Sequence, residues 1–176
     1  MEKTRTNTKP RIYVACLAAY NSGTLHGAWI DAGLGEDEVR GEIARMLAAS
    51  PEPDAEEYAI HDYEGFEGAT IEEYSGIGRV CELAGFIAEH GELGGAVLSH
   101  FGGDLDEARG ALEDRYLGRY RSLADYLEGV TEETISVPDA LRYYIDYEAM
   151  ARDADINGDV FTIQLGHHEV HVFSGH

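Results

Sequence analysis

The chain has 176 residues and a formal net charge of −21, from 34 acidic and 13 basic side chains. This charge repels nucleic acids and anionic membranes and attracts basic protein surfaces, which excludes direct nucleic-acid binding and membrane association as first expectations. The length suits one domain or two to three small modules. No apolar run approaches the roughly 18 residues of a membrane-spanning helix. The two cysteines, Cys16 and Cys81, predict reduced, buried thiols in a cytoplasmic protein.

The beginning of the chain predicts a polar arm followed by a small α+β module. Residues 1–10 are polar and basic without an apolar stretch, which predicts a disordered basic arm rather than a signal peptide. Residues 11–66 then combine β-branched and alternating segments with one amphipathic segment, which predicts a β-β-α-β order that begins with a hairpin. The expected elements are strands 11–17, 25–31 and 57–63 and a helix 37–49, ended by Pro51 and Pro53.

Residues 67–103 show helical spacing of apolar side chains and predict a small central helical module. Thr70–Glu73 matches a capping box and predicts a short helix. A longer helix is expected over Ile77–His90 and ends at Gly91, and a further helix over Leu93–Phe101 follows it. The residues expected to face inward on the longer helix are Val80, Leu83, Ala84 and Ile87.

The stretch Glu107–Glu128 is the most organised part of the sequence. Its pattern predicts a helix, a short strand at Tyr116–Tyr120 and a second helix, which Ser122 caps with Asp125 three residues later. Aromatic residues and arginines among carboxylates are typical of a contact surface. A core segment with solvated charges is the alternative interpretation.

Residues 104–176 are expected to form a C-terminal α+β module. The segment Ser136–Asp139, with proline in the first turn, predicts a helix that runs to about Arg152. Two strands, 159–165 and 169–173, flank Gly166 and predict a closing hairpin. The expected fold class is therefore α+β, an elongated chain of small modules. The residues expected on the inner face of the 136–152 helix are Leu141, Tyr144, Ile145 and Met150.

One segment resembles the start of a calcium loop. Asp153, Asp155 and Asn157 stand where oxygen ligands fall, and Gly158 stands at the turn position. The twelfth position is Gln164 instead of a bidentate glutamate, and a predicted strand follows in place of a second helix. We favour a polar turn, and a calcium-responsive binding protein remains an alternative function.

Other candidate chemistry is weak. His167, His168 and His171 suggest zinc, with His167 and His171 on one strand face, but no third convergent ligand is evident. His61 and Asp62 suggest an acid–base pair, for which a cross-strand or edge pair is the alternative. No P-loop or nucleophile elbow is present. We therefore expect no metal, no cofactor and no catalytic residue.

The charge is unevenly distributed along the chain. Residues 1–50 have a net charge of zero, residues 51–100 have −11, residues 101–150 have −7 and residues 151–176 have −3. A chain that is acidic only for solubility or high salt would more plausibly be acidic throughout. The neutral beginning indicates that the charge serves a local purpose, although an acidic adaptor that does not compete with DNA remains an alternative.

Three segments in order, Ile12–Asp31, Glu57–Phe66 and Leu112–Tyr126, resemble the ArdA family of antirestriction proteins. The resemblance covers about residues 11–173, and Leu112–Tyr126 is similar to the antirestriction motif of the family. It implies an elongated cytoplasmic homodimer of three small modules that mimics bent B-form DNA. It further implies that the protein occupies the DNA groove of type I restriction–modification enzymes and so protects incoming mobile DNA.

This resemblance assigns roles to two groups of residues. Since DNA carries one negative charge per roughly 1.7 Å, two copies with twice −21 would match about 71 Å, or about 21 base pairs. The expected DNA-mimicking acids are Glu56, Glu57, Asp62, Glu64, Glu67, Glu72, Glu73, Asp104, Asp106, Glu107, Glu113 and Asp114. The motif residues expected near the dimer interface are Leu112, Tyr116, Leu117, Gly118, Tyr120, Ser122, Asp125 and Tyr126.

Overall fold

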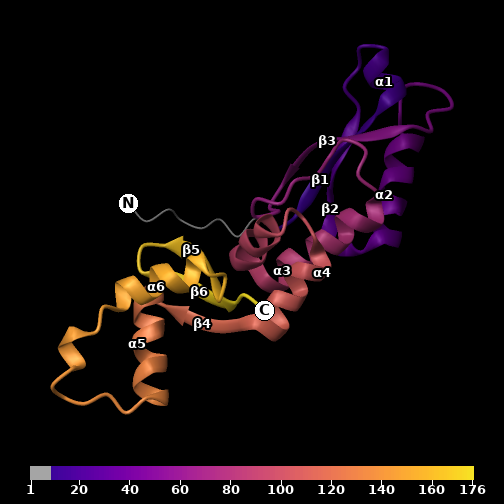
Figure 1. The fold of residues 1–176 in the computed structure, drawn as a ribbon. Helices are drawn as coiled ribbons and strands as arrows, with labels where there is room; N and C mark the ends of the chain where they lie inside the picture. The colour runs from indigo at the N-terminus through magenta and orange to yellow at the C-terminus, as the bar shows by residue number, and fades with distance from the viewer. Residues whose placement is uncertain (1–8) are drawn as a thin grey trace. The chain divides into compact units, whose positions relative to one another are not determined.

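A computed structural model describes residues 9–176 of the chain (Figure 1). The chain separates into two compact units, the first ending at Gly95 and the second running from Ala96 to His176. Each unit contains a three-stranded antiparallel sheet with helices, so the predicted α+β class is confirmed. The predicted basic arm lies almost entirely outside the described residues. The division into modules 11–66, 67–103 and 104–176 stays a prediction.

The first unit begins with the predicted β-β-α-β order, which is confirmed. Its sheet has the order β2-β1-β3, and the middle strand buries Ile12, Val14 and Cys16 completely. A short helix, α1, which was not expected, follows the first strand, and a turn at Ser22 and Gly23 leads on toward the second strand. Helix α2 packs beside the sheet through an apolar stripe that includes Val39 and Ile43. The elements are β1 (Arg11–Cys16), α1 (Leu17–Asn21), β2 (Gly27–Asp31), η1 (Ala32–Leu34), α2 (Glu36–Ala48) and β3 (Tyr58–Glu64).

The long helix α3 (Ile77–His100) consists of two segments that meet at Gly91. The backbone of Gly91, with φ of 60° and ψ of −143°, is not helical, and positive φ is a conformation that glycine adopts at little cost. The two helices expected on either side of Gly91 are therefore confirmed. The four residues expected to face inward before it are all buried: Val80, Leu83, Ala84 and Ile87.

The short helix expected at Thr70–Glu73 is wrong. The Glu72 amide donates to the Ser75 hydroxyl at 2.9 Å, and the Glu73 carbonyl accepts from the Ile60 amide on β3 at 2.9 Å. These bonds hold the segment against the edge of β3 as a turn. A single helical turn is unstable by itself, because it fixes several residues for one hydrogen bond. The backbone of this segment instead forms its hydrogen bond with the neighbouring strand β3.

The second unit contains a sheet of order β4-β6-β5, as Figure 1 shows. Phe173 on the middle strand is fully buried and stacks on Phe161 of β5 at 4.8 Å. The helix, strand and helix predicted over Glu107–Glu128 are confirmed, and so is the closing hairpin. The elements are α4 (Leu105–Gly110), η2 (Ala111–Arg115, a turn of π-helix), β4 (Tyr116–Tyr120), α5 (Leu123–Thr134), η3 (Arg142–Tyr144), α6 (Tyr147–Ile156), β5 (Val160–Gly166) and β6 (Glu169–Ser174).

The helix expected from Ser136 to about Arg152 is wrong in its first half. Residues 135–146 form a loop with one 3₁₀ turn, and α6 begins only at Tyr147. The Asp146 carboxylate accepts from the Ala149 amide at 2.9 Å, so Asp146 is the residue that caps the helix. The expected inner face is also wrong: Leu141, Tyr144 and Met150 are exposed, and Ile145 is half-buried.

None of the helices within residues 9–176 combines the length and the apolar composition that crossing a bilayer requires.

Candidate acidic interaction surface

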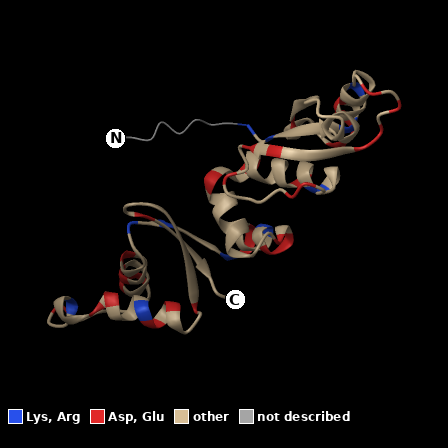
Figure 2. Cartoon of the chain, turned by 90° about the horizontal axis from the view of Figure 1, so that it is seen from above, with Lys and Arg blue, Asp and Glu red and all other residues tan. Residues whose placement is uncertain are grey.

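The twelve acids expected to mimic DNA fall into two groups, one in each unit. Figure 2 shows acidic positions in red along both units and far fewer basic positions in blue. Eleven of the twelve acids are exposed, and Glu64 is half-buried. Both groups therefore present formal negative charge to solvent.

The first group surrounds β3 and the segments beside it. Glu56 and Glu57 lie just before the strand, Asp62 and Glu64 on it, and Glu67 just after it. The remaining pair, Glu72 and Glu73, lies in the turn held against β3. Two of these acids have cationic or titratable partners: Glu64 pairs with Arg11, and Glu73 Oε1 lies 3.8 Å from His61 Nε2. Exposed pairs of this kind contribute at most about 1 kcal/mol.

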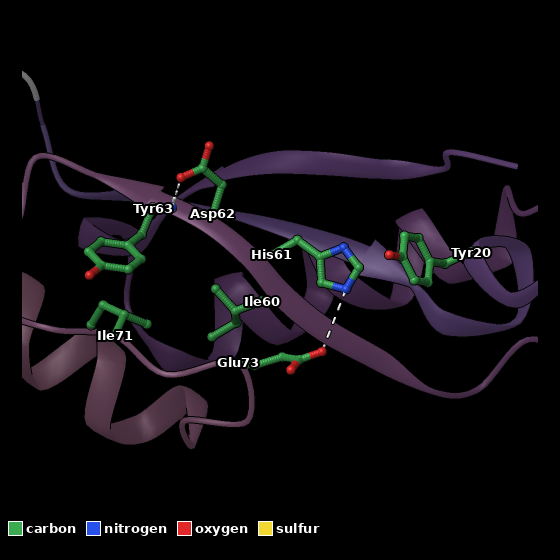
Figure 3. A pocket seen from close by; sticks show the side chains of 7 residues that line it. All are labelled: Tyr20, Ile60, His61, Asp62, Tyr63, Ile71 and Glu73. Carbon is green, nitrogen blue, oxygen red and sulfur yellow. Dashed lines mark hydrogen bonds and ion pairs between the residues drawn. The ribbon is translucent and has the colours of Figure 1, made fainter. Parts of the chain in front are cut away.

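An open groove of about 510 Å³ lies within this first group. Figure 3 shows the His61 ring between Tyr20 and Glu73, and the Tyr20 and His61 rings meet edge-on at 4.8 Å. A carboxylate beside aromatic rings is an arrangement that accepts a cationic side chain. The lining residues are Tyr20, Ile60, His61, Asp62, Tyr63, Ile71 and Glu73.

The structure does not bring His61 and Asp62 together as an acid–base pair. They are neighbours on β3 at an irregular position, where the register with β1 passes from Ile60 to Asp62 and skips His61. Figure 3 shows His61 turned toward Glu73 while Asp62 points away from it. The Asp62 carboxylate instead accepts from the backbone amide of Tyr63 at 2.8 Å. The partner of His61 is thus Glu73, which the sequence did not suggest.

The second group of acids lies on α4 and the π-helical turn that follows it. Asp104 caps α4, and its carboxylate accepts from the amides of Asp106 and Glu107 at 3.0 Å each. Acids in the first turn also interact favourably with the helix dipole. This explains why the start of α4 tolerates three acids, Asp104, Asp106 and Glu107, within four residues. The Glu107 carboxylate lies 3.2 Å from Arg115. Glu113 and Asp114 are exposed on the π-helical turn.

The motif residues gather around β4, which is an outer strand of its sheet. Gly118 has φ of +120°, a conformation that other residues adopt only with strain. The Tyr120 hydroxyl donates to the Leu117 carbonyl at 3.0 Å, and its ring contacts Tyr126 of α5 at 5.0 Å. Leu112 is half-buried. The Ser122 hydroxyl accepts from the Asp125 amide at 3.0 Å, so the predicted cap is confirmed.

Tyr116 connects the motif to the interior of the second unit. Its hydroxyl lies 2.7 Å from Nδ1 of His171, which is 7% exposed, and His171 Nε2 lies 3.3 Å from Glu169. The ring also packs on Phe173 at 5.1 Å. Burial raises the pKa of the Tyr116 hydroxyl above its usual value of 10.0, although nearby Arg119 opposes this effect. Tyr116 is therefore an anchored residue rather than a free surface ring.

The structure does not assemble the two metal sites considered from the sequence, the calcium loop and the histidine cluster. Asp153 and Asp155 lie on α6 rather than in an open loop, because the helix continues to Ile156. His167 lies in the turn between β5 and β6, so it does not share a strand face with His171. Within residues 9–176, no three His, Cys, Asp or Glu side chains come close enough to hold a metal ion.

Both cysteines are free thiols, but the burial expected for both applies fully to Cys16 only. Cys16 Sγ lies 3.3 Å from the Ser50 hydroxyl. Cys81 is partly buried, and this burial raises the pKa of its thiol, to which the Glu36 carboxylate adds. A raised pKa lowers the thiolate fraction and hence the reactivity of Cys81.

The groove was not predictable from the sequence, because its residues come from three separate segments. Tyr20 lies on α1, His61 lies on β3 and Glu73 lies in the turn before α3. None of these positions carries a motif. The available signal was the aromatic and acidic character of the β3 segment, which marks a region but not the partners of its side chains.

Comparison with known proteins identifies the family. Residues 12–169 match the model of the antirestriction protein (ArdA) family, which is nearly the whole chain of 176 residues. The search among curated proteins gave no match. The matched range includes both acidic groups and all of β4. The chain belongs to the ArdA family of antirestriction proteins.

Proposed function

We propose that this protein blocks type I restriction–modification enzymes by presenting DNA-like charge to their DNA-binding groove. The observation that carries the proposal is the exposure of eleven acids in two groups on an antirestriction protein of net charge −21. In this proposal the protein inhibits by occupancy and performs no reaction. It acts in the cytoplasm, where incoming mobile DNA meets the restriction system.

The physical basis is the summation of many weak contacts. Side chains on adjacent helical turns lie about 5–6 Å apart, which is close enough for the second group, on α4 and the π-helical turn, to present charge in a row. A groove that binds DNA carries lysines and arginines in similar density. Each exposed ion pair contributes at most about 1 kcal/mol and is screened by salt. Affinity must therefore depend on many acids together and must fall as salt rises.

The groove in the first unit supports the same interpretation. Its Glu73 carboxylate and Tyr20 ring suit the side chain of an arginine or lysine. Such a side chain would reach Glu73 in the open groove and displace its long contact with His61, which is 3.8 Å. The partner that this chemistry favours is a basic protein surface.

The proposal includes a homodimer formed through the motif residues around β4. Within residues 9–176, β4 pairs with β6 alone, so its other edge has no strand partner there. Tyr116 and Leu117 are 38% and 37% exposed on this strand. We expect Leu117→Asp to give monomers in sedimentation velocity, while Leu25→Asp, at an 84% exposed position, leaves the dimer intact. A monomeric wild-type protein would contradict the dimer.

The direct test is competition for a type I methyltransferase. Labelled DNA bound to the methyltransferase is titrated with the protein at low and at moderate salt. We expect displacement of the DNA at both salt concentrations, with a weaker effect at the higher one because exposed charges are screened. If the protein displaces no DNA at one or both of the salt concentrations, the proposal is contradicted.

A further inference from the structure

The loop between α5 and α6, residues 135–146, projects two aromatic side chains into solvent. Tyr143 is 91% exposed and Tyr144 is 84% exposed. Ile135 and Leu141 in the same loop are also more than half exposed. Figure 1 shows the loop in orange between the two helices. Contiguous exposed apolar groups mark interaction sites in many soluble proteins. We call residues 135–146 the tyrosine loop.

Two ion pairs and two backbone turns cross the tyrosine loop. Arg142 Nη1 lies 3.4 Å from Glu132 on α5, and Arg142 Nη2 lies 3.6 Å from Asp139. Backbone bonds from Leu141 to Pro138 and from Tyr144 to Leu141, of 2.9 and 3.0 Å, close two successive turns. The rings therefore project from a backbone that has internal turns of its own, and local turns of this kind reduce the entropy that a partner must remove.

The charge around the tyrosine loop selects the kind of partner. From residue 121 to residue 152 the sequence has seven acids and three bases, Arg121, Arg142 and Arg152, which gives a net charge of −4. Because Arg142 pairs with two of these acids, it offers little attraction to an anionic partner. The surface is therefore negative around exposed rings. A second copy of this acidic chain would be repelled there, whereas a basic surface would be attracted.

We propose that the tyrosine loop docks on an arginine-bearing surface of the inhibited restriction–modification enzyme, with Tyr143 and Tyr144 as its anchors. This inference rests on the proposed function, and it adds a contact outside the twelve acids. Arginine fits because its planar guanidinium stacks on a tyrosine ring while it pairs with a carboxylate. Tyrosines of this kind dominate the energy of many interfaces, whereas rim charges contribute little.

The test measures binding of the full-length protein to a type I methyltransferase by a direct method such as biolayer interferometry. The test variant is Tyr143→Ala/Tyr144→Ala, and the conservative variant is Tyr143→Phe/Tyr144→Phe. The matched control, Leu25→Ala/Ile156→Ala, also removes two exposed apolar side chains, which are 84% and 80% exposed outside the tyrosine loop. Circular dichroism and sedimentation velocity check that all variants keep the fold and the oligomeric state.

We expect the alanine variant to weaken binding about tenfold or more, as loss of two anchor residues does. The phenylalanine variant retains the rings and is expected to stay within about threefold of wild type, and the control within about twofold. Wild-type binding with an unchanged alanine variant would overturn this inference alone. Absence of wild-type binding would overturn the proposed function and this inference together. A change from dimer to monomer in the alanine variant would identify a second copy as the occupant and also overturn it.

Discussion

Two aromatic-rich regions of the second unit, β4 and the tyrosine loop, use similar residues in opposite ways. On β4, Tyr116 and Tyr120 are fixed by hydrogen bonds and by rings of β6 and α5. In the tyrosine loop, Tyr143 and Tyr144 project into solvent. The difference is the presence of a facing surface: β4 lies against a sheet and a helix, and the loop does not. An aromatic residue becomes core or contact surface according to what lies opposite it.

The largest effect is expected where the β4 backbone is most constrained. Gly118→Ala would place a Cβ at φ of +120° and 3.2 Å from the Tyr120 ring. Strain and the displaced ring should together cost about 2 kcal/mol or more of unfolding free energy. Urea denaturation measures this loss. Gly129→Ala on α5, where a Cβ meets nothing within 4 Å, should instead stabilise by roughly 0.5–1 kcal/mol. Equal responses of the two variants would contradict the constraint at Gly118.

The second prediction separates the anchored tyrosine from the projecting one. Tyr116→Phe leaves buried His171 Nδ1 without its partner at 2.7 Å and should cost about 1–2 kcal/mol. Tyr143→Phe should change the unfolding free energy by less than about 0.5 kcal/mol, because the hydroxyl is in solvent. Thermal or urea unfolding of the two variants checks the contrast. Similar losses in both would show that exposure does not separate these tyrosines.

A smaller effect distinguishes two serines that both match helix starts in the sequence. Ser122→Ala removes the hydroxyl that accepts from the Asp125 amide and should cost about 1 kcal/mol. Ser136 stands in the tyrosine loop, where no helix begins, so Ser136→Ala should cost less than about 0.5 kcal/mol. A loss of stability at Ser136 as large as that at Ser122 would contradict the loop and support a helix that begins at Ser136.

The smallest expected effect is a dependence of stability on alkaline pH. Burial raises the pKa of Tyr116 above 10.0 in the folded protein. In the unfolded chain Tyr116 loses its proton first, so its contribution is complete below pH 10 and is lost as the pH rises toward the folded-state pKa. Tyr116→Phe should therefore reduce the fall of the unfolding free energy above pH 10. An identical pH profile for wild type and Tyr116→Phe would rule out this contribution.

Local signals in the sequence predicted most of the elements correctly. The cap at Ser122 and the stop at Gly91 each act through immediate neighbours, and both are confirmed. The strand expected at 57–63 is also confirmed, but its burial does not alternate, because the register with β1 shifts between Ile60 and Asp62. The failures arise where a distant group competes for the same backbone. The Glu73 carbonyl accepts from Ile60, and Asp146 caps the helix that Ser136 was expected to start.

The candidate surface was predictable in composition but not in detail. The uneven charge pointed to residues 51–150, and eleven of the twelve chosen acids are exposed. The partner of His61 and the exposure of Tyr143 depend on which segments face each other, and a single sequence with no local motif does not contain that information. The assignment of individual acids to a DNA-like surface stays a prediction.

The most direct test of DNA mimicry compares two variants of equal net charge. One neutralises six acids of the candidate surface: Glu56→Gln, Glu57→Gln, Glu67→Gln, Glu72→Gln, Glu113→Gln and Asp114→Asn. The control neutralises six exposed acids outside it and outside the tyrosine loop: Glu38→Gln, Glu82→Gln, Glu89→Gln, Asp153→Asn, Asp155→Asn and Asp159→Asn.

The measurement is the affinity for a type I methyltransferase as a function of salt. Mimicry predicts that the first variant binds about tenfold or more weakly and with a shallower salt dependence, because fewer charges are neutralised on binding. The control should keep both the affinity and the slope of wild type. An unchanged first variant would contradict the account, since the six acids would then contribute nothing to binding. Equal losses in both variants would also contradict it, since total charge rather than its arrangement would then determine binding.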